Sequence, residues 1–219
     1  MTELKPPSNQ FLFADKSVLL LQTSQGMGHA KQLQLLRPDW KNQSFHGGLL
    51  RRRRAGRGQR PLSLREPLHA VFKIEKSRLA CGGLRSPKNF KLTQHIIAKY
   101  AAKFFVKIEQ ISIQGDHVHL LLRANRRTHF HHFFRVTTGQ ISQRFARVGL
   151  LKTKTVTDTP AARKLWKLRP FTRVVRGWRA YRTIRNYIQL NEKEARHEIK
   201  YQKLRLKGLS VDDWDKLWK

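Results

Sequence analysis

Cysteine and acidic residues are both scarce in this chain of 219 residues. The single cysteine, Cys81, excludes an intrachain disulfide and a zinc site built from several thiolates. Only 14 aspartates and glutamates stand against 46 lysines and arginines, which gives a formal net charge of +32. So few acids disfavour a nuclease that relies on several converging carboxylates.

Long hydrophobic runs are also missing from the N-terminal part. The most apolar stretch there, FLFADKSVLLL at 11–21, is interrupted by Asp15 and Lys16. It is too short to span a bilayer and lacks the layout of a signal peptide. We therefore expect no membrane partner and a cytoplasmic protein, associated with the nucleoid when it is bound to DNA.

The positive charge predicts a polyanionic partner, and nucleic acid is the natural one because neutralising phosphates releases counterions. Residues 1–60 form a basic, largely flexible N-terminal extension by composition. Its arginine block, LLRRRRAGRGQRP at 49–61, contains Arg51, Arg52, Arg53 and Arg54. We expect this block to contact phosphates, with a solvated linker as the alternative.

Regular periodicity begins after residue 60 and defines a domain over 61–207, followed by a short C-terminal helix over 208–219. Strands are predicted at 68–75, 106–113, 115–123 and 171–177, and helices at 86–105, 128–149 and 179–205. The order β-α-β-β-α-β-α predicts an α+β fold in which helices pack on a mainly antiparallel sheet. The helix 128–149 presents Phe130, Phe133, Phe134, Ile141 and Phe145 on one side.

Two histidines lie one residue apart in the predicted strand GDHVHLLLR at 115–123. Because strand side chains alternate between faces, His117 and His119 point to the same side. They form half of a metal site, although two polar residues on a solvated face would give the same pattern.

The helix YRTIRNYIQLNEKEA at 181–195 carries a second polar pair. Asn191 follows Tyr187 by one turn and shares its face, whereas Tyr181 aligns with Ile184 and Ile188 and is expected in the core.

The combination of GDHVHLLLR with IRNYIQLN about seventy residues later resembles the HUH single-tyrosine transposases. It is most similar to REP-associated tyrosine transposases (IS200-like transposases), and the segments at 60–73 and 169–191 extend the resemblance over residues 60–195. The resemblance implies a ferredoxin- or RRM-like palm. It also implies that Tyr187 is the nucleophile and that His117, His119 and Asn191 bind Mg²⁺ or Mn²⁺, with Glu194 as a substitute for Asn191.

The implied function is a metal-dependent DNA transposase or endonuclease. It would cleave and rejoin single-stranded or palindromic hairpin DNA through a 5′-phosphotyrosine, as a monomer or homodimer. The alternative is a non-catalytic DNA- or RNA-binding protein derived from a transposase. Further cations expected to line a DNA groove, with solubilising surface charge as the alternative for each, are Lys73, Arg123, Arg126, Arg127, Arg173 and Arg176.

Overall fold

The computed structural model describes residues 45–51, 59–80, 82–152 and 164–218, and Arg52, Arg53 and Arg54 lie outside these ranges. Within them the main elements are the strands β1 (Phe45–His46), β2 (Leu68–Lys73), β3 (Val106–Ile113), β4 (His117–Ala124) and β5 (Phe171–Val174), and the helices α1 (Pro87–Lys103), α2 (Arg127–Arg147), α3 (Trp178–Ala195) and α4 (Val211–Lys216). Short 3₁₀ segments are η2 (Gly48–Arg51), η3 (Lys76–Arg78) and η4 (Arg205–Gly208). No helix in these ranges is both long and apolar enough to cross a membrane.

The strands form one antiparallel sheet in the order β1-β5-β2-β4-β3. This confirms the predicted α+β fold and the order of its elements from β2 to α3. Strand β1 was not predicted: it pairs with β5 and lies in the segment assigned to the N-terminal extension.

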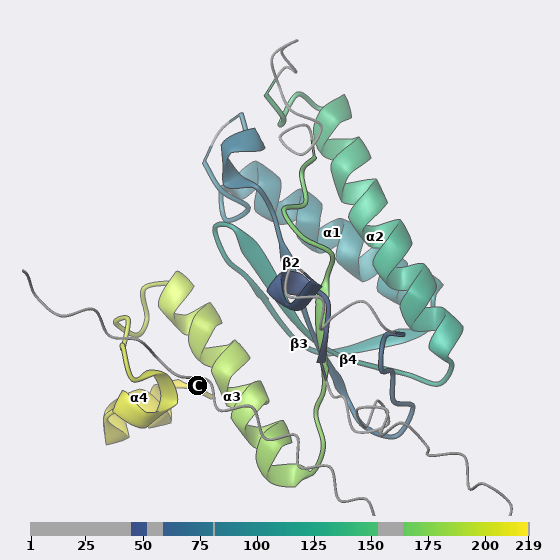
Figure 1. Ribbon diagram of the computed structural model, residues 1–219. Coiled ribbons are helices and arrows are strands. Elements are labelled where there is room, and N and C mark those ends of the chain that lie inside the picture. The colour runs from purple at the N-terminus through teal and green to yellow at the C-terminus, as the bar shows by residue number, and fades with distance from the viewer. Residues whose placement is uncertain (1–44, 52–58, 81, 153–163, 219) are drawn as a thin grey trace, which may run out of the picture. The chain divides into compact units, whose positions relative to one another are not determined.

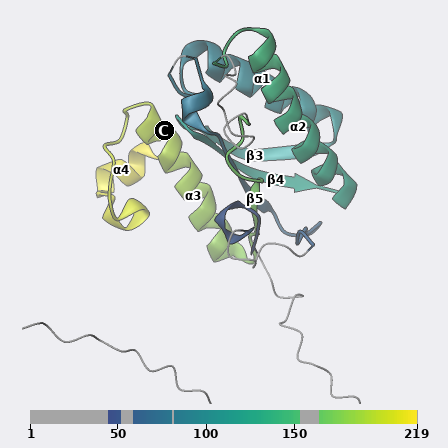
Figure 2. The same ribbon diagram turned by 45° about the horizontal axis from the view of Figure 1, so that its top comes forward.

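The two faces of the sheet are covered differently (Figures 1 and 2). Helices α1 and α2 pack on one face, and α3 crosses the other. The first face holds the main core, which includes Leu68, Ala70 and Phe72 of β2, Val118, Leu120 and Leu122 of β4, and all five predicted apolar residues of α2. On the second face a smaller cluster of Leu121, Val175 and Ile188 fixes α3 to the sheet.

Helix α3 ends at Ala195, so the prediction of one helix continuing to residue 205 was wrong. The chain turns at His197, whose φ is +63°. This reversal brings Ile199 back to pack with Leu190 of α3 and with Leu217, just after α4. Burial of these side chains outweighs continuation of the helix. Helix α4 begins at the predicted cap, where Ser210 Oγ accepts from the Asp213 N–H at 3.2 Å.

Candidate active site

The two strand histidines and Tyr187 meet on the face of the sheet that α3 crosses. The ring centroids of His117 and His119 are 4.7 Å apart, and that of His119 is 5.5 Å from the Tyr187 ring, in edge-to-face contact. The same-face prediction for His117 and His119 is therefore observed in the structure. Among the described residues, no hydrogen bond engages the Tyr187 hydroxyl, and this side chain is half-buried.

The Nδ1 atom of each histidine has a hydrogen-bond partner that orients the ring. His117 Nδ1 bonds Asp116 Oδ1 at 2.5 Å, and His119 Nδ1 lies 3.1 Å from Nε2 of His69 on β2. His69 is directly next to the site because β2 pairs with β4, and its ring stacks on that of His119 at 5.4 Å. His119 Nε2 is buried and has no hydrogen-bond partner within the described ranges. A buried ring nitrogen without a partner is costly unless a ligand satisfies it.

Burial keeps the inner histidines uncharged. It lowers the pKa of His69 to about 4, with a further contribution from the charge of Arg173. Burial, followed by the neighbouring charges of His117 and His69, lowers the pKa of His119 to about 2. Neutral imidazole is the form that binds metal ions.

Asp116 remains ionised beside the histidines. Its burial alone would raise the pKa of the carboxyl group, but the hydrogen bond from His117 and the interaction with Lys73 lower it. Lys73 Nζ is 3.2 Å from Asp116 Oδ2, so the carboxylate joins the end of β2 to the start of β4.

Asn191 and Glu194, the two candidates for a third ligand, are both bound by Arg205. The Asn191 side chain is buried: its amide donates to the Tyr187 carbonyl oxygen at 2.8 Å, and its Oδ1 accepts from Arg205 Nη2 at 2.6 Å. Both Glu194 oxygens accept from Arg205 Nη1, at 2.8 and 2.7 Å. The guanidinium also lies 5.4 Å from the centre of the Tyr187 ring. Within the described ranges, no three His, Cys, Asp or Glu side chains converge as a metal site.

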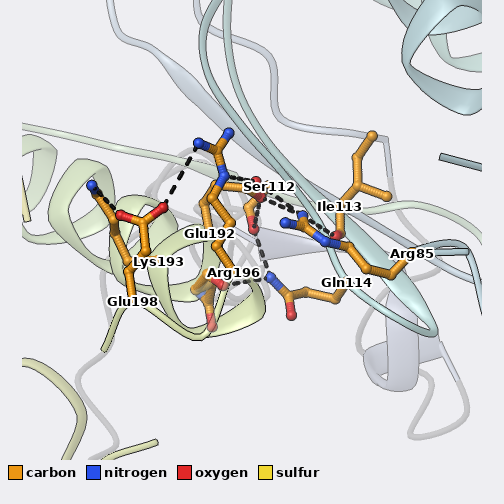
Figure 3. Close-up of polar contacts among 9 residues, drawn as sticks. Arg85, Ser112, Ile113, Gln114, Glu192, Lys193, Arg196 and Glu198 are labelled. Atoms are coloured by element: carbon orange, nitrogen blue, oxygen red, sulfur yellow. Dashed lines mark hydrogen bonds and ion pairs between the residues drawn. The ribbon is translucent and has the colours of Figure 1, made fainter. Parts of the chain in front are cut away.

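Glu192 anchors the end of α3 that carries Tyr187 and Asn191 (Figure 3). Its carboxylate accepts from Arg85 Nη1 at 2.9 Å on both oxygens, from Arg196 Nε at 2.9 Å and from Ser112 Oγ at 3.3 Å. Arg85 also donates to the Ile113 carbonyl oxygen at 3.1 Å. These bonds join α3 to β3 and to the segment before α1, and so fix the distance between the tyrosine helix and the histidine strand.

Gln114 adds a second link from the hairpin turn that joins β3 to β4. Its amide donates to the Asn191 carbonyl oxygen at 2.8 Å and to Ser112 Oγ at 2.7 Å.

The predicted DNA-binding cations differ in their exposure to solvent and in the residues that they contact. Arg126 and Arg127, at the start of α2, are exposed. Arg123 instead donates to Glu109 and to the Arg65 carbonyl oxygen, at 2.5 and 2.8 Å.

The remaining predicted cations lie on or near strands β2 and β5. Lys73 is exposed and pairs with Asp116. Arg173 lies 5.0 Å from the Phe45 ring centre, and Arg176 is exposed on the loop after β5. Arg51 ends η2.

Three contributors to this site were not found from the sequence: His69, Arg205 and Glu192. His69 lies at an alternate position of a predicted strand, but only the pairing of β2 with β4 shows that it contacts His119. Arg205 was placed at the end of a continuous helix, whereas the turn at His197 returns it to Tyr187. Periodicity within one segment contains no information on either contact.

Comparison with known proteins identifies the family. Residues 84–191 match the model of the family described as "Transposase IS200 like", and the chain belongs to this family. The matched range includes His117, His119, Tyr187 and Asn191, but His69 and Arg205 lie outside it. No curated protein matches the sequence.

Two solved structures are similar. One is a REP-associated tyrosine transposase bound to a REP hairpin, 16% identical, with 64% of this chain and 73% of that chain covered and a TM-score of 0.47. The other is a putative transposase from Deinococcus radiodurans R1, 13% identical, with 62% of this chain and 98% of that chain covered and a TM-score of 0.37.

Replacing Glu192 by Gln should loosen helix α3. The Glu192 side chain is only 12% exposed and accepts from three side chains, two of them arginines, so we expect the free energy of unfolding in urea to fall by about 2 kcal/mol. Glu198→Gln is the matched control because Glu198 is exposed and pairs with Lys193. It should leave the unfolding curve unchanged. Equal curves for the two variants would show that the Glu192 contacts do not hold α3.

Proposed function

We propose that the chain is a metal-dependent transposase or endonuclease that cleaves and rejoins single-stranded or hairpin DNA through a 5′-phosphotyrosine at Tyr187. The observation that carries the proposal is the placement of Tyr187 against His119, whose ring also contacts that of His117 and whose buried Nε2 has no partner among the described residues. Membership of the IS200-like transposase family supports it.

The residues fit a divalent cation, Mg²⁺ or Mn²⁺. His117 and His119 would bind it through their Nε2 atoms, because their Nδ1 atoms are engaged by Asp116 and His69. In the tautomer that frees Nε2, His119 donates from Nδ1 to His69, the outer support that metal-bound histidines generally have. Asn191, or Glu194 in its place, would complete the protein ligands once released from Arg205. A bound cation would polarise the scissile phosphate and neutralise its charge.

The protein residues carry out the covalent step. The Tyr187 oxygen attacks phosphorus, the bond from phosphorus to the 3′ oxygen breaks, and the strand leaves with a 3′-hydroxyl. The phenolic proton passes to solvent, and the leaving oxygen takes up a proton. Negative charge grows on the phosphate during attack, and Arg205, which lies over the tyrosine ring, is placed to stabilise it. The phosphotyrosine keeps the energy of the phosphodiester, so rejoining needs no nucleotide cofactor.

DNA would be held by cations on the site's face and at the ends of neighbouring elements. We assign phosphate contacts to Arg126 and Arg127, which are exposed, and to the arm of Arg51, Arg52, Arg53 and Arg54. Lys73, Arg173 and Arg176 are retained as candidates, whereas Arg123 acts mainly within the fold through Glu109 and Arg65. The protein would act as a monomer or homodimer.

A second function, a non-catalytic DNA- or RNA-binding protein derived from a transposase, is favoured by one observation. Arg205 occupies the oxygens of both third-ligand candidates, Asn191 and Glu194. Only the enzyme would bind the metal ion and form a covalent adduct with DNA. Metal binding and adduct formation can each be measured.

Metal affinity tests the histidine site without requiring activity. In a Mn²⁺ titration followed by electron paramagnetic resonance, the double variant His117→Ala, His119→Ala should lose binding, and EDTA should abolish cleavage by the wild type. His69→Leu should weaken binding by about 10- to 100-fold, because the support of His119 is lost. His69→Gln, which keeps an acceptor at the position of Nε2, should recover most of the affinity. Wild-type affinity in His69→Leu would exclude the supporting role.

Tyr187→Phe should bind DNA and Mn²⁺ normally but form no covalent adduct with labelled hairpin DNA on a denaturing gel, because only the attacking oxygen is removed. The matched control is Tyr181→Phe, which should keep the adduct, since the Tyr181 ring stacks on Trp178 at 5.4 Å and, among the described residues, contacts neither histidine ring. An adduct that depends on Tyr181 would reverse the assignment. If the wild type forms no adduct with any single-stranded or hairpin DNA, the binding-protein function is the better one.

The arginine arm can be tested through the salt dependence of binding. Replacing Arg52, Arg53 and Arg54 by Gln should reduce the slope of log affinity against log salt by up to about 2 on single-stranded DNA, because each lost phosphate contact removes about 0.7. The control replaces Arg135, Arg144 and Arg147, exposed on α2 across the sheet from the site, and removes the same charge. Equal slopes in the two triple variants would show that the arm makes no specific phosphate contact.

A further inference from the structure

An apolar pocket lies beside the candidate active site, on the part of the sheet face formed by β2 and β5. It has a volume of about 390 Å³. Leu49, Val71, Leu168 and Phe171 supply its apolar lining, and Lys73 and Arg169 add two cations. Leu49 is 62% exposed.

Gly48 of the N-terminal extension lines this pocket, and Gly47 precedes it. Gly47 and Gly48 have φ values of +80° and +56°, which favour glycine. A Cβ on Gly47 would lie 2.3 Å from the Pro170 carbonyl oxygen, and one on Gly48 would lie 3.2 Å from the Phe171 Cβ. The segment is therefore shaped to lie against β5, and it also bonds there through Gly48 N–H to the Arg169 carbonyl oxygen at 3.1 Å. These residues precede the range that matches the family.

A row of rings connects the pocket to the nucleophile. The Phe171 ring centre is 6.5 Å from that of His69, His69 is 5.4 Å from His119, and His119 is 5.5 Å from Tyr187. The strand register agrees, because Val71 and Lys73 pair directly with His119 and His117. A DNA strand with a phosphate at Tyr187 would therefore pass the pocket within a few nucleotides.

We propose that this pocket holds one unpaired nucleobase of the DNA strand that is bound at Tyr187. The phenyl ring of Phe171 and the aliphatic side chains match the faces of a base, and base–aromatic stacking tolerates any sequence. Lys73 and Arg169 are placed to contact the phosphates on either side of it. An apolar peptide would make no favourable contact with these cations. A nucleotide would place its base on the apolar residues and its phosphates beside Lys73 and Arg169. The inference rests on the proposed function in one respect only, the assignment of DNA as the ligand.

The test compares two probes with the same phosphates: a 12-nucleotide oligothymidylate and a 12-residue oligomer of abasic sites. Binding is measured by fluorescence anisotropy without metal, so that cleavage plays no part. The double variant Leu49→Ala, Leu168→Ala should bind oligothymidylate about tenfold more weakly, as expected for the loss of one stacked base. It should bind the abasic oligomer like the wild type. The control Val148→Ala changes a residue that is 54% exposed at the end of α2 and should bind both probes normally.

Equal losses on the two probes would overturn the proposal, because the pocket would then act through phosphates or through the fold. No loss on either probe would overturn it as well. Photocrosslinking with 5-iodouracil in the oligothymidylate gives a second readout: the wild type should crosslink at Phe171, and the double variant should not. If binding and crosslinking behave as expected while no adduct forms at Tyr187, the pocket stands and the proposed cleavage fails.

Discussion

The pairing of β2 with β4 is the constraint on which the rest of the structure depends. In this register His69 lies opposite Leu121 and Val71 lies opposite His119, so three histidines from two strands share one face. The same register places Leu68, Ala70 and Phe72 with Leu122, Leu120 and Val118 in the main core on the other face. A slip by one residue would exchange the faces, bury imidazoles under α1 and α2, and expose the leucines. The core therefore fixes the site: the apolar alternation that drives folding also brings His69 behind His119.

The few acidic residues of the chain hold the site together. Glu192 ties α3 to Arg85 and Ser112, Glu194 holds Arg205, and Asp116 joins His117 to Lys73. On a chain with a net charge of +32, each of these carboxylates also offsets repulsion among the cations that it joins. The most buried of them, Glu192 and Glu194, lie on the helix of the tyrosine, where an error in position would separate it from the histidines.

Local patterns predicted the local parts of this structure. Alternation placed His117 and His119 on one face, and the apolar stripe of α2 was fully buried. Tyr181 packs against the Leu121 cluster as expected, but Tyr187 packs against it too, so helical phase did not separate the two tyrosines. Contacts between distant segments were not predictable in this way. Strand β1 depends on two glycines that fit against Pro170 and Phe171, and the end of α3 depends on the burial of Ile199 beyond the turn. Both are decided by packing partners in other segments of the chain, on which periodicity within one segment gives no information.

Burial and charge act on the histidines in the same direction. Desolvation favours the neutral ring, and the positive charges of Arg173 near His69 and Arg205 near His119 favour it further. Neutral rings are suited to bind a cation, but the same positive field repels one. Arg205 also competes for the oxygens of Asn191 and Glu194. In the proposed function a phosphate group would change this balance, since it would attract both a divalent cation and the guanidinium and so release the oxygens that Arg205 holds. The proposed function therefore requires metal and DNA to bind together rather than one after the other.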